Sequence, residues 1–235
     1  MTDFLYPFLD AQERDQDALL RDLAASARAK AAESAALRAS TLAACADALA
    51  RAAAEMARRF AAGGRLFCFG NGGSSTDATT LADLFARPPG HVPLPAWSLT
   101  ADQAILTALG NDVGFELVFA RQLIARAAAG DIAVALSTSG SSADLTAAFR
   151  EAHARGLFTV GFAGYDGGRF ATSPNVDVCF TVASQSVHRI QEAQALLGHR
   201  LWQAVHEEPA MRELATGSSA QHLIASPTER SEGER

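Results

Sequence analysis

The sequence predicts an α/β fold: a three-layer αβα sandwich around a five-stranded parallel sheet, preceded by two N-terminal helices. Beyond residues 63–64, short apolar runs alternate with segments that have a helical pattern. The runs are almost continuously apolar, which is typical of parallel strands buried on both faces. Upstream, residues 15–61 contain neither Gly nor Pro and are rich in strong helix formers, so we expect two long helices there.

Each predicted N-terminal helix carries apolar side chains at steps of three and four residues, which places them on one face. These stripes need a partner, either the domain that follows in the chain or a second copy of the chain. The stripe residues are Leu19, Leu20 and Leu23 on the first helix and Leu42, Cys45, Leu49, Ala53 and Met56 on the second.

The α/β part is read from runs that fit strands and from the helical patterns between them. The predicted strands are 66–69, 94–99, 132–136, 159–162 and 176–182. The predicted intervening helices are 75–86, 102–109, 115–128, 142–155 and 187–206. Three regions follow from this pattern: an N-terminal helical segment for oligomerisation (1–60), the α/β domain (61–208) and a polar tail expected to be disordered (209–235).

Composition excludes several classes of function. The formal net charge is -6, so the chain offers no basic surface for a phosphate polymer, and a direct nucleic-acid ligand is not expected. Three cysteines, an odd number without metal-binding spacing, indicate a reducing, cytoplasmic setting. The first ten residues lack the basic region of a secretory signal, and charged residues interrupt the Ala-rich stretches too often for a membrane span.

Two loops that follow predicted strands have unusual composition. In an open α/β sheet, ligands bind at the carboxyl ends of the strands, so these loops are the candidate site. Residues 69–74 contain three glycines, which allow backbone amides to approach a ligand. Residues 137–142 carry five hydroxyl groups and lead into a predicted helix.

The hydroxyl-rich loop 137–142 is suited to a phosphate group. A helix N-terminus presents unsatisfied N–H groups and a partial positive charge, and hydroxyls add hydrogen-bond donors without a cation. The alternative is that Ser and Thr only form turns and caps there, but a single hydroxyl would suffice for that. Neither loop matches the Walker or dinucleotide-binding motif, so ATP and NAD are not expected.

Five motifs in this order resemble the SIS (sugar isomerase) domain family, in its phosphoheptose isomerase and DnaA initiator-associating protein branch. They are Gly70-Asn71-Gly72-Gly73-Ser74, Gly110-Asn111-Asp112-Val113-Gly114-Phe115, Ser137-Thr138-Ser139-Gly140, Gly164-Tyr165-Asp166-Gly167-Gly168 and Arg189-Ile190-Gln191-Glu192. The resemblance spans about residues 61–206 and implies a flavodoxin-like αβα sandwich. It also implies a homotetramer whose N-terminal helices form a central bundle, with sites between subunits.

The resemblance further implies a phosphorylated sugar as the ligand. The hydroxyl loop would hold the phosphate, and amide and carboxylate side chains would bond the sugar hydroxyls. The binding residues carried over are Asn71, Gly72, Gly73, Asn111, Asp112, Ser137, Thr138, Ser139, Ser142 and Gln191.

The chain departs from the family where the reaction would occur. Moving a proton between adjacent sugar carbons calls for an acid and a base. The family has a His and a Glu on the helix after the glycine loop and a Gln and a His on the last long helix, a set that can hold zinc. Here the first pair aligns with Thr80 and Leu84, while Gln191 and His199 keep the second. No metal cofactor is therefore expected, because a Leu side chain cannot bind a cation.

His199 is the predicted catalytic residue, although a lone His on an amphipathic helix is also a common structural residue. The second proton carrier is open between Asp112, His188 and Asp83. Two functions follow: a ketose/aldose isomerase acting on sedoheptulose 7-phosphate or a similar ester, or a non-catalytic sugar-phosphate sensor or oligomeric scaffold that acts through protein partners. A DNA-binding regulator is disfavoured because the first 60 residues lack a basic helix-turn-helix segment.

Overall fold

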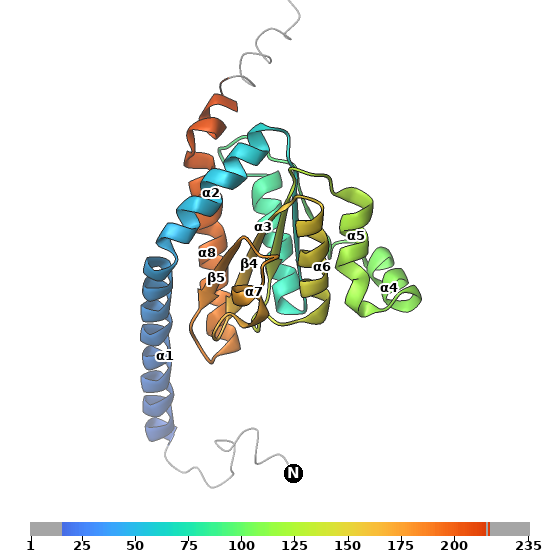
Figure 1. Ribbon diagram of the computed structural model, residues 1–235. Coiled ribbons are helices and arrows are strands. Elements are labelled where there is room, and N and C mark those ends of the chain that lie inside the picture. The colour runs from blue at the N-terminus through green and yellow to red at the C-terminus, as the bar shows by residue number, and fades with distance from the viewer. Residues whose placement is uncertain (1–15, 215, 217–235) are drawn as a thin grey trace, which may run out of the picture.

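The computed structural model describes residues 16–214 and 216 and contains one parallel sheet of five strands (Figure 1). The strand order is β2-β1-β3-β4-β5, the doubly wound order of flavodoxin-like folds. The predicted fold class is confirmed. The strands are β1 (Leu66–Gly70), β2 (Ala96–Ser98), β3 (Ile132–Leu136), β4 (Phe158–Gly164) and β5 (Val178–Val182).

The helices between the strands also follow the predicted pattern, with two differences. The segment predicted as one helix from 115 to 128 is a short 3-10 turn followed by α5, and a short helix, α7, was not predicted. The bounds are α3 (Gly73–Ala86), α4 (Gln103–Asp112), η2 (Phe115–Leu117), α5 (Val118–Arg126), α6 (Ala143–Ala154), α7 (Gly168–Thr172) and α8 (Val187–Glu207).

Helices cover both faces of the sheet, because alternate residues of each buried strand point to opposite sides. Leu66 and Cys68 of β1 lie in a core with α3, α8 and the second N-terminal helix, whereas Phe67 and Phe69 lie in a core with α5 and α6. Every residue of β1, β3 and β4 is buried, which explains their continuous apolar runs.

The N-terminal region forms two helices, α1 (Gln16–Ala44) and α2 (Ala46–Ala61). Helix α2 packs on α8, and its stripe residues Ala53 and Met56 are buried. Helix α1 extends beyond the α/β body, with Leu20 63% and Leu23 51% exposed (Figure 1). The α/β body thus covers the apolar stripe of α2, whereas Leu20 and Leu23 of the α1 stripe stay exposed.

The prediction that the disordered tail starts at residue 209 is wrong. Residues 209–214 are helical, and Met211 is buried against the core, because an apolar side chain at this point still reaches the body. The part of the tail expected to be disordered from residue 217 onward lies outside the described residues. No helix in the described part of the chain has the length and apolarity needed to cross a bilayer.

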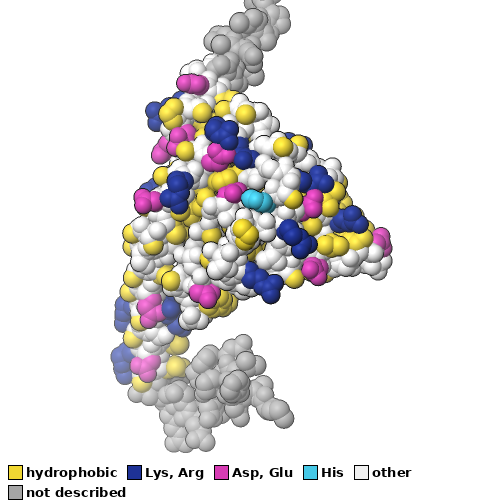
Figure 2. Space-filling view, in the orientation of Figure 1, with side chains coloured by type: hydrophobic (Ala, Val, Ile, Leu, Met, Phe, Trp, Pro, Cys, Tyr) yellow, Lys and Arg dark blue, Asp and Glu magenta, His cyan; other side chains and the backbone are white. Residues whose placement is uncertain are grey.

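Charged side chains are distributed evenly over the face seen in Figure 2. Basic and acidic groups alternate there without a large area of one sign. This surface has no extended basic stripe for a nucleic acid.

Candidate functional site

The two candidate loops lie side by side at the point where the strand order reverses. Strand β1 pairs with β2 on one side and with β3 on the other, so the loops after β1 and β3 flank the crevice where ligands bind in such sheets. Gly70 and Leu136 are paired residues, and a Cβ on Gly70 would lie 2.8 Å from the Leu136 carbonyl oxygen. Only glycine allows the loops this approach.

Internal hydrogen bonds shape the hydroxyl-rich loop. The Ser137 hydroxyl accepts from the Gly140 amide at 3.0 Å, and the Ser139 hydroxyl accepts from the Ser141 amide at 3.3 Å. Gly140 has φ +61°, where L side chains are strained. Ser137 therefore acts partly as the turn former that the alternative interpretation describes.

Two other hydroxyls of the loop are free. Ser142 is the N-cap residue of α6, yet its side chain makes no capping bond. The Thr138 carbonyl accepts from the Gly164 amide at 3.0 Å. The Thr138 hydroxyl makes no hydrogen bond to any of the described residues. The first-turn amides of α6, which have no partner inside the helix, lie beside these hydroxyls. The arrangement offers donors to an anion.

A third loop, residues 164–168, holds the hydroxyl-rich loop in place. The Gly140 carbonyl accepts from the Phe170 amide at 3.0 Å, and the Ser141 hydroxyl accepts from the Arg169 amide at 3.2 Å. A Cβ on Gly168 would lie 2.2 Å from the Ser139 carbonyl oxygen. The fourth sequence motif thus acts as a support for the second loop.

The glycine-rich loop is tied to both neighbouring helices. The Asn71 amide donates to the buried Asp144 carboxylate of α6 at 2.8 Å. A Cβ on Gly73 would lie 2.3 Å from Nε2 of Gln191 on α8. The structure therefore brings Asn71, Gly73 and Gln191 to one end of the sheet, as the sequence predicts.

A cavity of about 250 Å³ lies between α3 and α8. It contains the positions where the chain departs from the family, Thr80 and Leu84, together with His199. Its walls are mainly apolar, from Leu81, Leu84, Leu136, Ala195 and Gly198. His199 is exposed, and its ring lies 5.2 Å from that of Trp202, centroid to centroid.

Two polar residues of this cavity were missed by the sequence analysis. Asp77 has a buried carboxylate oxygen, Oδ2, without a hydrogen-bond partner, and burial raises the pKa of its side chain. Gln194 is fully buried; its Nε2 donates to the Ser137 carbonyl at 2.8 Å, and its Oε1 has no partner. Helical spacing could have found both, since Asp77 lies seven residues before Leu84 and Gln194 lies three residues after Gln191.

The second proton carriers considered from the sequence lie elsewhere. Asp83 is exposed and pairs with Arg87 at 2.7 Å, which agrees with its position about 100° around the helix from Leu84. Asp112 accepts a hydrogen bond from Asn111 at 2.8 Å on the exposed end of α4, which Figure 1 shows at the opposite side of the molecule from α8. His188 is not among the residues that line the cavity.

The cavity does not suit a zinc ion. A Thr hydroxyl is a poor zinc ligand and a Leu side chain cannot bind one, which leaves Asp77 and His199 as its strong donors. In the described part of the chain, no three His, Cys, Asp or Glu side chains are grouped so that they could hold a metal.

Comparisons with known proteins agree with this geometry. The SIS domain family matches residues 31–164. Phosphoheptose isomerase from Aquifex aeolicus is 44% identical over 141 residues, which cover 59% of this chain and 73% of that protein. The enzyme of the same name from Solidesulfovibrio magneticus is 46% identical over 146 residues, covering 60% and 68%. The solved phosphoheptose isomerase structure from Neisseria gonorrhoeae has a TM-score of 0.73 at 33% identity, with 79% of this chain and all of that one covered.

Proposed function

Because this chain belongs to the SIS domain family and to its phosphoheptose isomerase branch, we propose that it binds a sugar phosphate and moves a proton at the carbon beside the sugar carbonyl. The single observation that carries the proposal is the hydroxyl-rich loop, whose free hydroxyls lie at the N-terminus of α6 on the ligand-binding edge. The phosphate binds there, because hydroxyl and amide donors replace its hydration without a cation.

The sugar chain extends from this loop across the glycine-rich loop. Asn71 and Gln191 lie along that path and supply amide groups for sugar hydroxyls. Asn111 and Asp112 lie on α4, away from α8, so they serve a site that includes a second subunit. The assembly we propose is a homotetramer in the cytoplasm, built on the projecting helix α1 with its exposed Leu20 and Leu23.

Proton transfer is assigned to Asp77 and His199, which line one cavity. The Asp77 carboxylate takes the proton from the carbon beside the carbonyl, and His199 donates a proton to the carbonyl oxygen, which gives an enediol. Protonated Asp77 then delivers its proton to the former carbonyl carbon, and His199 takes the proton of the other enediol hydroxyl, whose carbon becomes the new carbonyl. Burial raises the pKa of Asp77, which makes its carboxylate a stronger base. No metal ion takes part in this assignment. Without a metal to polarise the carbonyl, the reaction is slower than in a complete site.

The test is proton exchange in deuterium oxide. Sedoheptulose 7-phosphate and a panel of shorter ketose phosphates are incubated with the protein, and NMR follows deuterium at the carbon beside the carbonyl. Asp77→Asn should lower exchange by about 10²- to 10⁴-fold while ligand binding remains. Asp83→Asn is the matched control, because Asp83 lies on the same helix outside the cavity. Absence of exchange with the unmodified protein at every pH would contradict the catalytic part of the proposal.

A second function is favoured by one observation, the apolar side chain of Leu84 among the residues that line the cavity. In this alternative the protein is a sugar-phosphate sensor or oligomeric scaffold that acts through protein partners. Ser139→Ala then weakens ligand binding, whereas His199→Ala leaves it nearly unchanged and there is no turnover to lose. An enzyme loses function with both substitutions.

A further inference from the structure

The cavity between α3 and α8 has an unusual combination of walls. Three leucines, Leu81, Leu84 and Leu136, form much of its wall. Gly198 also lines the cavity and has no side chain; a Cβ at this position would lie in contact with a Leu81 methyl carbon, at 3.4 Å. A hydroxyl group placed directly against these leucines would have no hydrogen-bond partner there, and burying it without one costs free energy. The walls favour a ligand with an apolar group at this point.

The same cavity contains an unsatisfied hydrogen-bond acceptor. Gln194 is completely buried, its Nε2 donates to the Ser137 carbonyl at 2.8 Å, and its Oε1 has no partner in the part of the chain that the structure describes. Buried polar atoms are nearly always paired in folded proteins, so an unpaired acceptor beside a cavity indicates a missing donor. A ligand group that enters beside Gln194 is one source of that donor.

The cavity lies next to the start of the hydroxyl-rich loop. Leu136 lines it and is followed directly by Ser137, the first residue of the hydroxyl-rich loop, to which Gln194 is bonded. One ligand can therefore place its phosphate on the loop and a substituent between the two helices. A volume of about 250 Å³ is below that of a typical complete ligand pocket and suits part of a ligand.

We propose that this cavity receives a short acylamino substituent of the bound sugar phosphate, its N–H donating to Gln194 Oε1 and its acyl carbons packing on Leu81 and Leu84. An acylamino group has both features that the walls require, one N–H donor and an apolar end. A deoxy carbon lacks the donor, and a free amine is charged and lacks the apolar end. The inference rests on the proposed sugar-phosphate site and names the class of sugar bound there.

Such a substrate limits the chemistry. A sugar with an acylamino group on the carbon beside its aldehyde still has a C–H bond there, so Asp77 can remove and return that proton. Because this carbon has no hydroxyl, the sugar cannot become a ketose. In deuterium oxide we therefore expect the sugar to take up deuterium at that carbon and to invert its configuration there.

The experiment compares N-acetylglucosamine 6-phosphate with glucose 6-phosphate by calorimetry on the full chain. We expect the acylamino ester to bind about tenfold more tightly, from one buried apolar group and one additional hydrogen bond. Leu84→Gln should bring the ratio of the two affinities to about one, whereas Leu84→Met, which keeps an apolar side chain of similar size, should retain the preference.

The outcomes separate the two proposals. Equal affinities for the two esters, or a preference that Leu84→Gln does not alter, overturn the acylamino subsite and leave the phosphate site standing. If neither ester nor any ketose phosphate binds, the proposed function fails and the subsite with it. Should Leu84→Gln unfold the chain, Gln194→Leu provides the second variant, and it must weaken the acylamino ester more than glucose 6-phosphate.

Discussion

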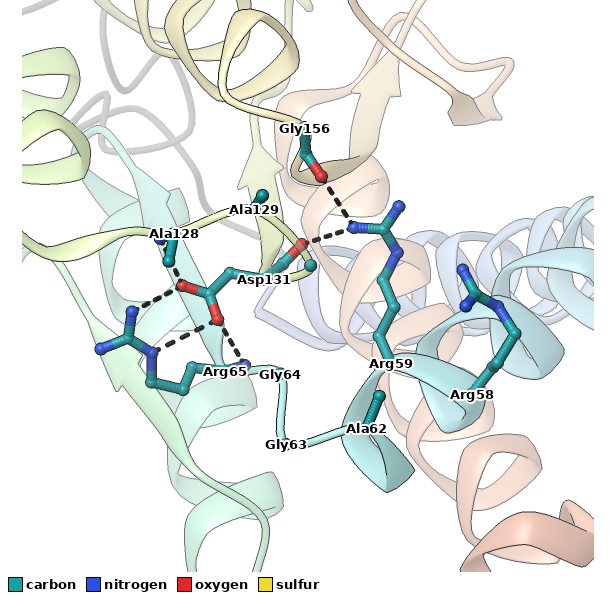
Figure 3. A pocket seen from close by; sticks show the side chains of 11 residues that line it. Arg58, Arg59, Ala62, Gly63, Gly64, Arg65, Ala128, Ala129, Asp131 and Gly156 are labelled. Atoms are coloured by element: carbon teal, nitrogen blue, oxygen red, sulfur yellow. Dashed lines mark hydrogen bonds and ion pairs between the residues drawn. The ribbon is translucent and has the colours of Figure 1, made fainter.

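The two edges of the sheet differ in what their polar groups are bonded to. At the amino edge, the pocket in Figure 3 is lined by arginines whose donors are used within the protein. Arg65 pairs with the buried Asp131 at 2.8 Å, and Asp131 also accepts from the Ala128 amide at 2.8 Å. Arg59 donates to the carbonyls of Asp131 and Gly156, each at 3.0 Å.

At the carboxyl edge, by contrast, polar groups are left unpaired. Among the residues that the structure describes, the hydroxyls of Thr138 and Ser142 and one buried oxygen each of Asp77 and Gln194 have no hydrogen-bond partner. The arginine-lined pocket at the amino edge therefore serves stability, because its arginines are bonded to Asp131, to Glu55 and to backbone carbonyls. The unpaired groups at the carboxyl edge cost stability, and such costs are common at functional sites.

The largest expected effect concerns the amino edge. Asp131→Ala removes the partner of Arg65 and of the Ala128 amide, so it should lower the free energy of unfolding by about 3 kcal/mol in urea titrations. Arg87→Ala, which breaks the exposed pair with Asp83, is the control and should change it by less than about 0.5 kcal/mol. Sugar-phosphate affinity of folded Asp131→Ala should not change; a large loss would show that the amino edge is not purely structural.

An effect of intermediate size is expected at two helix N-cap residues, one of which should affect ligand binding and the other stability. Ser142 caps α6 without a side-chain bond, whereas the Asp102 carboxylate on α4 accepts from the Ile105 amide at 3.1 Å. Ser142→Ala should weaken sugar-phosphate binding about tenfold and leave stability within about 0.5 kcal/mol. Asp102→Ala should lower stability by about 1 kcal/mol and leave binding unchanged. Calorimetry and urea unfolding on both variants measure this; the reverse pattern would mean that the Ser142 hydroxyl is structural.

The smallest expected effect is a gain in stability. Burial raises the pKa of Asp77 above its unfolded value, so its protonated form favours the folded state at low pH, and that contribution is lost as the pH rises through the folded pKa. Asp77→Asn should therefore raise the unfolding free energy at neutral pH by about 0.5–1 kcal/mol, with a smaller difference below pH 4. Unfolding curves at several pH values test this. A loss of stability at neutral pH would show that the carboxylate has a stabilising partner.

Much of the fold is predictable from local patterns. Strand β3 and the strong helices near both ends of the α/β domain agree with the sequence prediction to within one or two residues, because continuous apolar runs and helix periodicity are properties of a single segment. Predicted strand 94–99 is only Ala96–Ser98, since an edge strand has one neighbour to define its length. The helical residues 209–214 were missed because Pro209 is typical of a helix end and the sequence from 216 onward is polar, whereas the packing of Met211 is a tertiary contact.

The sequence by itself determined the sheet, the two loops at its carboxyl edge and the replacement of two expected site residues by Thr80 and Leu84. Only the tertiary structure decided that Asp77, Gln194 and His199 share a cavity, and that Asn111 and Asp112 lie on the side away from α8. The physical reason is that a loop's chemistry is set by consecutive residues. The meeting of α3 and α8 is set instead by packing between segments more than a hundred residues apart, for which no local pattern exists.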